Sequence, residues 1–504
     1  MKCSRLGLRC TAVAASGLIA ATTTLAASTP AGAQTAAVPG PVVKLIAAQK
    51  NITVQSFGGQ VFFDPGIYVA SLNSALVLHV QRRSYTKPVT LTQIIRLPDG
   101  ATKSRVLPGS MRRGFAGLQG FLRLRISKPG GKTVSNRRML FCPDSFDPQR
   151  VSPNSPANSP YPQQCGSGDP FPLSSVWAVA KGWAVDPFES EGAFSQLALG
   201  TYKVTATITP RYVRLFHITA HDATTSVTVT VVKGTGCCFG HSRRPVTHGT
   251  TLPTAPAVPL LRNPPPSALP DLVPLPSWGI STSSPRATKT RPKRDLLNFG
   301  ATVWSGGSSP LDVEGFRSHG APVMKAYQYF SRNGRIIGRV RAGTMGFDTR
   351  HGHNHWHFEQ FARYRLLNST RTPAVRSHKQ GFCIFPTDQV DMLLRDASWQ
   401  QSFSGFGGDC GLPTALWVRE MMPIGWGDTY FQSVAGQSFN ITHLPNGTYY
   451  IEIIANPEHV LRESNTSNDE SLRKVILGGT PGHRTVRVPA FHGLDPENGS
   501  GPIF

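Results

Sequence analysis

Short runs in which apolar and polar side chains alternate recur between about residues 40 and 235, and clusters of turn-forming residues separate them. Alternation with a period of two is typical of strands that have one buried face and one hydrated face. The clearest runs are residues 75–80, 121–126, 202–208 and 226–231. We therefore expect a β-sandwich over residues 34–235, and we expect its topology to be immunoglobulin-like.

The pattern changes after residue 235. Residues 236–268 are rich in Pro, Ser and Thr and have no periodicity, which predicts a semi-extended linker. Strand-like runs return at 301–304 and 449–455, so a second β domain is expected over residues 269–504. With 49 Gly and 42 Pro in 504 residues, many turns and few long helices are expected, and the predicted class is all-β.

The first 33 residues have the pattern of an export signal. Basic residues within the first nine positions precede a run of small and apolar residues at 11–27, and the Ala-Gly-Ala at 31–33 suits cleavage. An uncleaved anchor is the alternative. No later segment reaches the roughly 18 apolar residues that a membrane span needs. The mature chain is expected to start near Gln34 and to be secreted and extracellular, in solution or associated with the cell surface.

Six of the eight cysteines follow the predicted signal. An even number of cysteines in an exported chain indicates disulfide bonds. Cys383 and Cys410 lie far along the sequence from the others and are expected to pair with each other. The connectivity of the remaining four stays open, and these are Cys142, Cys165, Cys237 and Cys238.

The charge is unevenly distributed. Of the total net charge of +24, residues 34–238 carry +13 and residues 239–504 carry +8. A basic exported domain attracts anionic partners such as cell-wall phosphates or acidic polysaccharides, although a solvated basic surface without a partner explains the charge equally well. Nucleic acid is not expected, because the basic residues are not interleaved with an aromatic platform.

Segment 351–357 reads His-Gly-His-Asn-His-Trp-His and is the strongest chemical signal. In a strand, His353, His355 and His357 would point to one face, with about 13 Å between the first and the last. Three neutral imidazoles suit copper, zinc, iron or nickel, and a set of three leaves coordination positions open for water or substrate. A catalytic metal site is predicted, with His351 as an outer neighbour. A histidine-rich surface turn is the alternative.

Several motifs follow in a fixed order, and together they resemble the lysyl oxidase family over about residues 270–477, especially the versions exported by bacteria. The matching blocks are 353–357, 361–367, 378–383, 425–430, 436–442, 455–457 and 463–465. The chain contains no Walker A loop, no dinucleotide-binding glycine motif and no G-x-S-x-G elbow, so nucleotide binding and serine hydrolysis are not indicated.

The resemblance implies a β-sandwich catalytic domain and copper-dependent oxidation of primary amines, including peptidyl lysine, to aldehydes with release of ammonia and hydrogen peroxide. It assigns the copper to His353, His355 and His357. It also implies a quinone cofactor, lysine tyrosylquinone, made from Lys379 and Tyr430. These histidines alone do not distinguish copper from zinc.

Amine oxidation needs an electrophilic acceptor for the electrons and a base that removes a proton from the carbon next to nitrogen. Asp428 and Asp388 lie close in sequence to the cofactor motifs. Asp428 is the preferred candidate for the base, and Asp388 stays open as the second.

A second possible metal site combines the start of the domain with a later loop rich in carboxylate and amide groups. Oxygen ligands of this kind suit calcium, and the same positions resemble a calcium site of the family. An Asx-rich turn is the alternative. The candidate ligands are Asp271, Leu272, Glu463, Asn465, Asn468 and Asp469.

The leading hypothesis is therefore a secreted amine oxidase whose basic front domain holds an anionic surface or polymer. Its substrate would be an amine or a lysine-containing protein. The rival hypothesis is an adhesin or scaffold at the cell surface that keeps the fold and a bound metal without forming the quinone.

Overall fold

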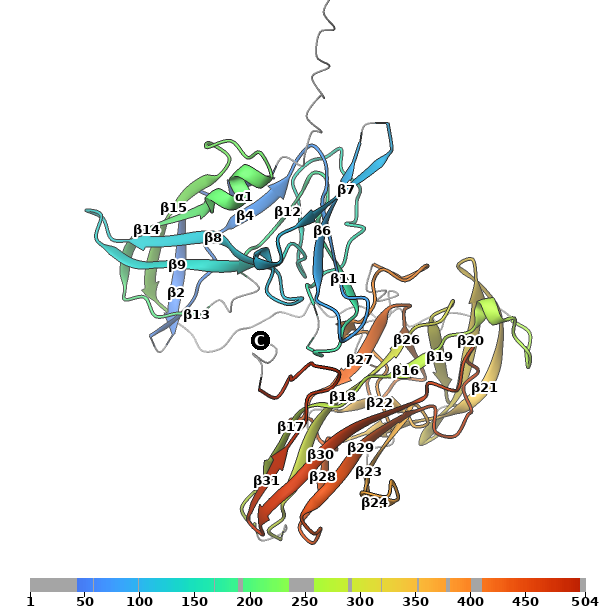
Figure 1. Ribbon diagram of the computed structural model, residues 1–504. Coiled ribbons are helices and arrows are strands. Elements are labelled where there is room, and N and C mark those ends of the chain that lie inside the picture. The colour runs from blue at the N-terminus through green and yellow to red at the C-terminus, as the bar shows by residue number, and fades with distance from the viewer. Residues whose placement is uncertain are drawn as a thin grey trace, which may run out of the picture. The chain divides into compact units, whose positions relative to one another are not determined.

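A computed structural model describes residues 43–498 with several gaps (Figure 1). All described residues belong to one compact unit, Gly40–Phe504. The predicted export signal and the pair Cys237 and Cys238 lie outside the described residues. The gaps are residues 58, 98, 167, 189–193, 235–257, 289–291, 319, 351–352, 378–380 and 400–409.

The described part of the chain is almost entirely β-structure, which confirms the predicted class. Its one α-helix, α1 (Pro210–Leu215), is a single short segment, and Pro210 starts it because proline needs no hydrogen-bond acceptor there. Two short 3₁₀ turns, η1 (Gly109–Met111) and η3 (Pro266–Ala268), accompany it.

Among the described residues, the first half of the chain contributes fifteen strands. These are β1 (Val43–Ala47), β2 (Asn51–Phe57), β3 (Gln60–Phe62), β4 (Ile67–Ser71), β5 (Leu76–Gln81), β6 (Thr90–Arg96), β7 (Thr102–Leu107), β8 (Leu118–Ser127), β9 (Thr133–Phe141), β10 (Gln149–Arg150), β11 (Ser174–Val179), β12 (Trp183–Val185), β13 (Phe194–Ser195), β14 (Gly200–Ile208) and β15 (Thr224–Lys233).

Three sheets form from these strands. Two have four strands, in the orders β1-β4-β12-β10 and β11-β5-β6-β7, and one has seven, in the order β13-β3-β2-β15-β14-β8-β9. Alternate residues of β8 and β14 are buried, as expected for strands with one hydrated face. The buried residues of all three sheets contribute to one hydrophobic cluster. An immunoglobulin-like order of these strands stays a prediction.

The described part of the second half contributes sixteen strands. These are β16 (Leu272–Pro274), β17 (Trp278–Ser283), β18 (Leu296–Ser305), β19 (Leu311–Phe316), β20 (Val323–Arg332), β21 (Arg335–Asp348), β22 (His355–Phe358), β23 (Ala362–Leu367), β24 (Pro373–Arg376), β25 (Asp388–Gln389), β26 (Trp417–Met422), β27 (Trp426–Tyr430), β28 (Ser438–Asn440), β29 (Gly447–Ala455), β30 (Glu470–Thr480) and β31 (His483–Arg487).

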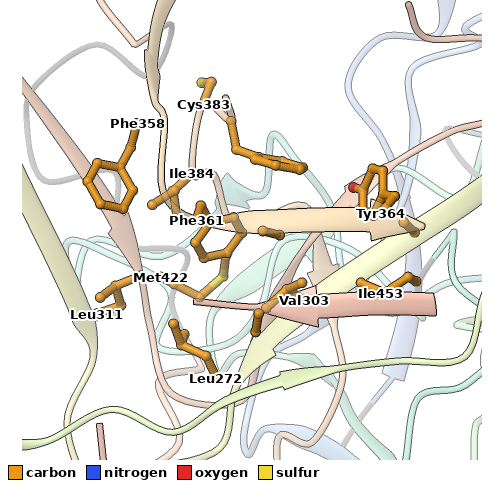
Figure 2. Packing of buried hydrophobic residues seen from close by; sticks show 14 of the residues in the cluster. Leu272, Val303, Leu311, Phe358, Phe361, Tyr364, Cys383, Ile384, Met422 and Ile453 are labelled. Atoms are coloured by element: carbon orange, nitrogen blue, oxygen red, sulfur yellow. The ribbon is translucent and has the colours of Figure 1, made fainter. Parts of the chain in front are cut away.

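Three further sheets form here, and none of the described sheets mixes strands from the two halves. One is built on β16-β18-β27-β25, one has the order β22-β21-β20-β19-β26, and one has the order β24-β23-β29-β30-β31. Their inner faces share a core. Figure 2 shows part of it, and its labelled side chains include Phe358, Phe361, Tyr364, Ile384 and Val303. This core carries the chain segments that hold the candidate site.

The end of the expected linker has defined contacts. Leu261 donates a backbone hydrogen bond to Arg339 in β21, and Arg339 donates one to Pro259. Ala268 is buried. Residues 258–268 therefore run along the second half of the protein, while the preceding part of the predicted linker lies outside the described residues.

Two disulfide bonds join segments that are close in sequence. Cys383 pairs with Cys410, as the sequence analysis expects. Cys142 pairs with Cys165, which settles one bond among the four cysteines whose connectivity was open. Among the described residues, no helix is both long and apolar enough to cross a membrane. Disulfides of this kind are typical of an oxidising compartment.

Candidate metal and tyrosine site

The histidine segment lies at the end of a β-hairpin. β22 pairs antiparallel with the last residues of β21, so that His355 lies opposite Asp348 and His357 lies opposite Gly346. Side chains alternate along a strand, which directs His355 and His357 to the same side.

His353 is not part of the strand, and here the sequence-based geometry was wrong. The amide of His353 donates to the carbonyl of Arg350 at 3.0 Å, and Asn354 has a positive φ of 56°. Asparagine tolerates this left-handed conformation better than most residues. The chain therefore turns at Asn354, and His353 reaches the other two histidines from a turn instead of extending the strand.

The three imidazoles converge. Their ring centroids lie 5.8 Å apart for His353 and His355, 5.0 Å for His353 and His357, and 4.8 Å for His355 and His357. One ring nitrogen from each lies within 4.8 Å of the others. His353 and His357 are buried, and His355 is partly exposed. Such a set could hold one metal ion and leave an outward position open for water or substrate.

Asp348 is a neighbour of this cluster that the sequence analysis missed. Its Oδ2 lies 3.3 Å from Nδ1 of His357 and 3.6 Å from Nδ1 of His353. Burial by itself raises the pKa of Asp348, but hydrogen bonds from Arg350 and the charge of His353 outweigh it and hold this pKa below its usual range. A carboxylate beside two imidazoles fixes their ring orientation. Only the pairing of β21 with β22 brings Asp348 there.

Tyr430 is the last residue of β27, and its hydroxyl is fixed by the backbone of one residue. The hydroxyl accepts a hydrogen bond from the amide of Cys383 at 2.9 Å and donates to the carbonyl of Cys383 at 3.1 Å. The rings of Phe382 and Tyr430 pack edge to face, with 5.2 Å between their centroids. Burial, reinforced by the charges of Asp428 and Glu420, raises the pKa of Tyr430 well above its usual value.

The segment 381–383 connects the histidines with Tyr430. Phe382 exchanges two backbone hydrogen bonds with Phe358, the residue after His357. A methyl group added at Gly381 would lie 2.9 Å from Cβ of His357, so only glycine lets the backbone approach that ring so closely. The segment thus lies against His357 on one side and against the hydroxyl of Tyr430 on the other.

Lys379 and His351 lie outside the described residues. Lys379 precedes Gly381 by two positions. The proximity of Lys379 to Tyr430, and with it the formation of a quinone, stays a prediction.

Two buried carboxyl groups lie close to Tyr430. Asp428, the preferred base, is 3 % exposed and lies opposite Val303 in the sheet. Glu420 in β26 is 1 % exposed, and its Oε2 accepts a hydrogen bond from the amide of Ile384 at 3.0 Å. Burial, and then the charge of Asp428, raises the pKa of Glu420 well above its usual value. The sequence analysis missed Glu420, because a glutamate that follows an arginine in a strand carries no local sign of function.

Asp388, the second candidate base, has different neighbours. Its carboxylate accepts hydrogen bonds from the amide of Gly168 and from the hydroxyl of Thr387. The next residue, Gln389, accepts one from Ser175. These bonds connect β25 to the segments around residues 168 and 175. The hydrogen bonds of Asp388 thus stabilise the fold.

The candidate calcium ligands join the first strand of the second half to a late loop. The amide of Leu272 donates to Oε2 of Glu463 at 3.1 Å. Asn468 donates to Oδ2 of Asp271 at 3.2 Å. Asn465 differs from the others, because it is exposed and its side-chain oxygen caps Ser467 in an Asx turn.

Several oxygens of this cluster are buried without a hydrogen-bond partner among the described residues: Oδ1 of Asp271, Oδ1 of Asn468 and both carboxyl oxygens of Asp469. Burial, with mutual repulsion, raises the pKa of Glu463 to about 7 and that of Asp469 to about 6. Unsatisfied buried oxygens are costly, and a hard cation is the partner that satisfies them.

The part of the chain that contains the candidate site is similar to known proteins. Residues 339–483 match the family model described as lysyl oxidase. This range contains the three histidines, Tyr430 and the late loop, but it leaves out the first three sheets.

The individual relatives are distant. "Lysyl oxidase homolog 2" of Gallus gallus and of Homo sapiens are each 28% identical over 148 residues, which is 29% of this chain and 17% of the relative. "Lysyl oxidase homolog 4" of Homo sapiens is 28% identical over 137 residues, 27% of this chain and 16% of the relative. The chain thus matches about a sixth of the length of these relatives.

Proposed function

We propose that this protein is a secreted copper-dependent amine oxidase that converts primary amines, on peptidyl lysine or on small molecules, to aldehydes with release of ammonia and hydrogen peroxide. Molecular oxygen would accept the two electrons and become the peroxide, and water would supply the aldehyde oxygen. The observation that carries the proposal is the position of segment 381–383 between His357 and the hydroxyl of Tyr430. It lies within the region that matches the lysyl oxidase model.

The donor set fits the implied metal. His353, His355 and His357 would hold copper, because imidazole nitrogens bind copper strongly and their ring nitrogens converge. Asp348 would orient two of these rings through Nδ1. When bound, the copper and a lysine tyrosylquinone made from Lys379 and Tyr430 supply the electron acceptor for amine oxidation.

Asp428 would remove the proton from the carbon next to the substrate nitrogen. It is buried beside Tyr430, where exclusion of water strengthens its action as a base. Burial raises the pKa of Glu420, so this carboxyl group would hold its proton to a higher pH than an exposed glutamate does. The two hydrogen bonds between the Tyr430 hydroxyl and the backbone of Cys383 would hold Tyr430 in one orientation.

We also propose a structural calcium ion beside Asp271 and Asp469. The orphaned buried oxygens support this assignment. The ion would attach β16 to the loop before β30 and would take no part in the chemistry. Secretion is part of the same proposal and is supported by the two disulfides. The bacterial type of the oxidase is proposed from the sequence motifs alone.

The deciding experiment measures amine-dependent hydrogen peroxide from the copper-loaded protein and from Tyr430→Phe and His355→Ala. We expect peroxide and quinone absorption from the parent, and loss of both in each variant. Tyr450→Phe is the matched control, because Tyr450 is a partly exposed residue of β29.

Copper content and melting temperature must be recorded for every variant. Tyr430→Phe is expected to keep its copper, whereas His355→Ala is expected to lose it. A parent that holds copper but yields neither peroxide nor quinone absorption would reject the oxidase and favour the adhesin or scaffold hypothesis.

A further inference from the structure

The seven-stranded sheet of the first half carries basic but no acidic side chains in its strands. None of its strands, β2, β3, β8, β9, β13, β14 and β15, contains Asp or Glu. The two four-stranded sheets of this half also have no Asp or Glu in their strands. Four arginines lie on the neighbouring strands β8 and β9. Figure 1 shows these two strands next to β14.

Paired residues of neighbouring strands point to the same side of a sheet, so the strand register defines rows of side chains. One row on the solvent side contains Arg138, Arg123, Thr207 and Thr224. Both arginines of this row are exposed. Like charges directly opposite each other destabilise a strand pair. Repulsion between Arg123 and Arg138 therefore destabilises this row, and an anionic ligand would relieve the repulsion.

The adjacent row contains Asn136, Arg125, Thr205 and Ser226. Nε of Arg123 donates to the side chain of Asn136 at 2.8 Å, which holds the guanidinium against the sheet surface. An arginine held in place before binding loses less side-chain entropy when a ligand arrives.

The turn between β8 and β9 extends the charge. It reads Lys-Pro-Gly-Gly-Lys, and both Lys128 and Lys132 are exposed. The basic edge thus includes two strands and their turn, while the neighbouring strands β14 and β15 present mostly hydroxyl groups. At about 4.8 Å between strands, the five strands from β9 to β2 span about 19 Å.

We propose that this acid-free sheet face binds a linear polysaccharide that carries carboxylate groups. Guanidinium groups pair with carboxylates in a fork geometry. The adjacent Thr, Ser and Asn side chains donate and accept hydrogen bonds as sugar hydroxyls require. A nucleic acid fits less well, because the exposed apolar side chains of the face, Phe57, Val134 and Val232, lie at strand ends and form no stacking platform. The proposal does not depend on oxidase activity.

Binding of polygalacturonate to the full chain tests the proposal, with neutral dextran and single-stranded DNA as comparison ligands. The variant Arg123→Gln/Arg125→Gln/Arg138→Gln removes three charges from the face. We expect its affinity for polygalacturonate to fall about tenfold or more. Its melting temperature should be no lower than that of the parent, because the repulsion between Arg123 and Arg138 is removed.

The matched control is Arg332→Gln/Arg335→Gln/Arg487→Gln, which removes three exposed charges elsewhere. It is expected to bind within about twofold of the parent. The proposal is wrong if both variants lose affinity equally, since net charge alone would then explain binding. It is also wrong if the parent fails to bind polygalacturonate. The same holds if the parent binds single-stranded DNA as tightly as polygalacturonate and the Arg123→Gln/Arg125→Gln/Arg138→Gln variant loses both affinities equally.

Discussion

The carboxyl groups buried at the two faces of β26 have different partners. On one face, Arg419 forms a bidentate ion pair with Asp312, at 2.9 and 2.6 Å, in the neighbouring strand β19. Glu314 lies beside this pair and accepts a hydrogen bond from Trp417. On the other face, the next residue, Glu420, is buried beside Tyr430.

Within the described parts of the chain, Glu420 accepts a hydrogen bond from the amide of Ile384 and forms no ion pair with a basic side chain. A buried carboxylate needs a partner or a proton. On one face of the strand, Arg419 pairs with Asp312, although burial still raises the pKa of Asp312. On the other face, burial raises the pKa of Glu420 well above its usual value. The difference separates a carboxylate that supports the fold from a carboxyl group beside a candidate site.

Breaking the ion pair should have the largest effect. Asp312→Asn leaves the partly buried Arg419 without its bidentate partner and with only Glu314 at 3.8 Å as a counter-charge. It is expected to destabilise the protein by about 3 kcal/mol, measured by urea denaturation. The double variant Asp312→Leu/Arg419→Met removes both charges and should recover much of that loss. Equal losses in the single and double variants would contradict this account.

Calcium should have the next largest effect. At a hundredfold excess over its dissociation constant, calcium is expected to stabilise the metal-stripped parent by about 2.7 kcal/mol. The variant Asp469→Asn should lose this response, while Asp495→Asn, an exchange outside the cluster, should keep it. If calcium leaves the melting temperature of the parent unchanged, the proposal of a structural calcium ion is wrong.

Asp348 provides a smaller test on the histidine cluster. Asp348→Asn keeps the shape of the side chain but removes its charge, and we expect about tenfold weaker copper binding in a competition titration with a chelator. Asp396→Asn is a control at a carboxylate outside the cluster. Unchanged copper affinity would mean that Asp348 does not orient the imidazoles.

The smallest effect is expected at Glu420, and it depends on pH. Because the pKa of Glu420 is raised in the folded protein, the folded state keeps a proton that the unfolded chain releases above about pH 4.5. Stability from this group is therefore lost as the pH rises. Glu420→Gln should match the parent near pH 4 and be the more stable of the two at pH 8 in denaturant titrations. A variant that is less stable than the parent at both pH values would show that the carboxylate is charged in the folded state.

The alternating patterns allowed the sequence to predict the all-β class, because hydration of one face imposes a period of two on any such strand. The pair Cys383 and Cys410 was also predictable from its isolation in the sequence. The shape of the histidine segment was not. A straight strand was expected, but the turn at Asn354 depends on a backbone conformation that no periodicity reveals.

Residue identity alone determined which atoms are available: three imidazoles within five residues, a tyrosine in the motif Gly-Asp-Thr-Tyr, and a cluster of carboxylates and amides near residue 465. The local sequence also determined that Gly381 can approach another side chain closely. These properties are fixed by covalent structure and need no fold.

Tertiary structure alone decided which of these atoms meet. Asp348 and Glu420 have no local signal, and each reaches its position through strand pairing, Asp348 with the histidine strand and Glu420 with β19. The sheet register also brings Arg123 opposite Arg138. Contacts between residues far apart in sequence depend on the packing of whole sheets, so burial, pKa and charge density at these positions are properties of the fold.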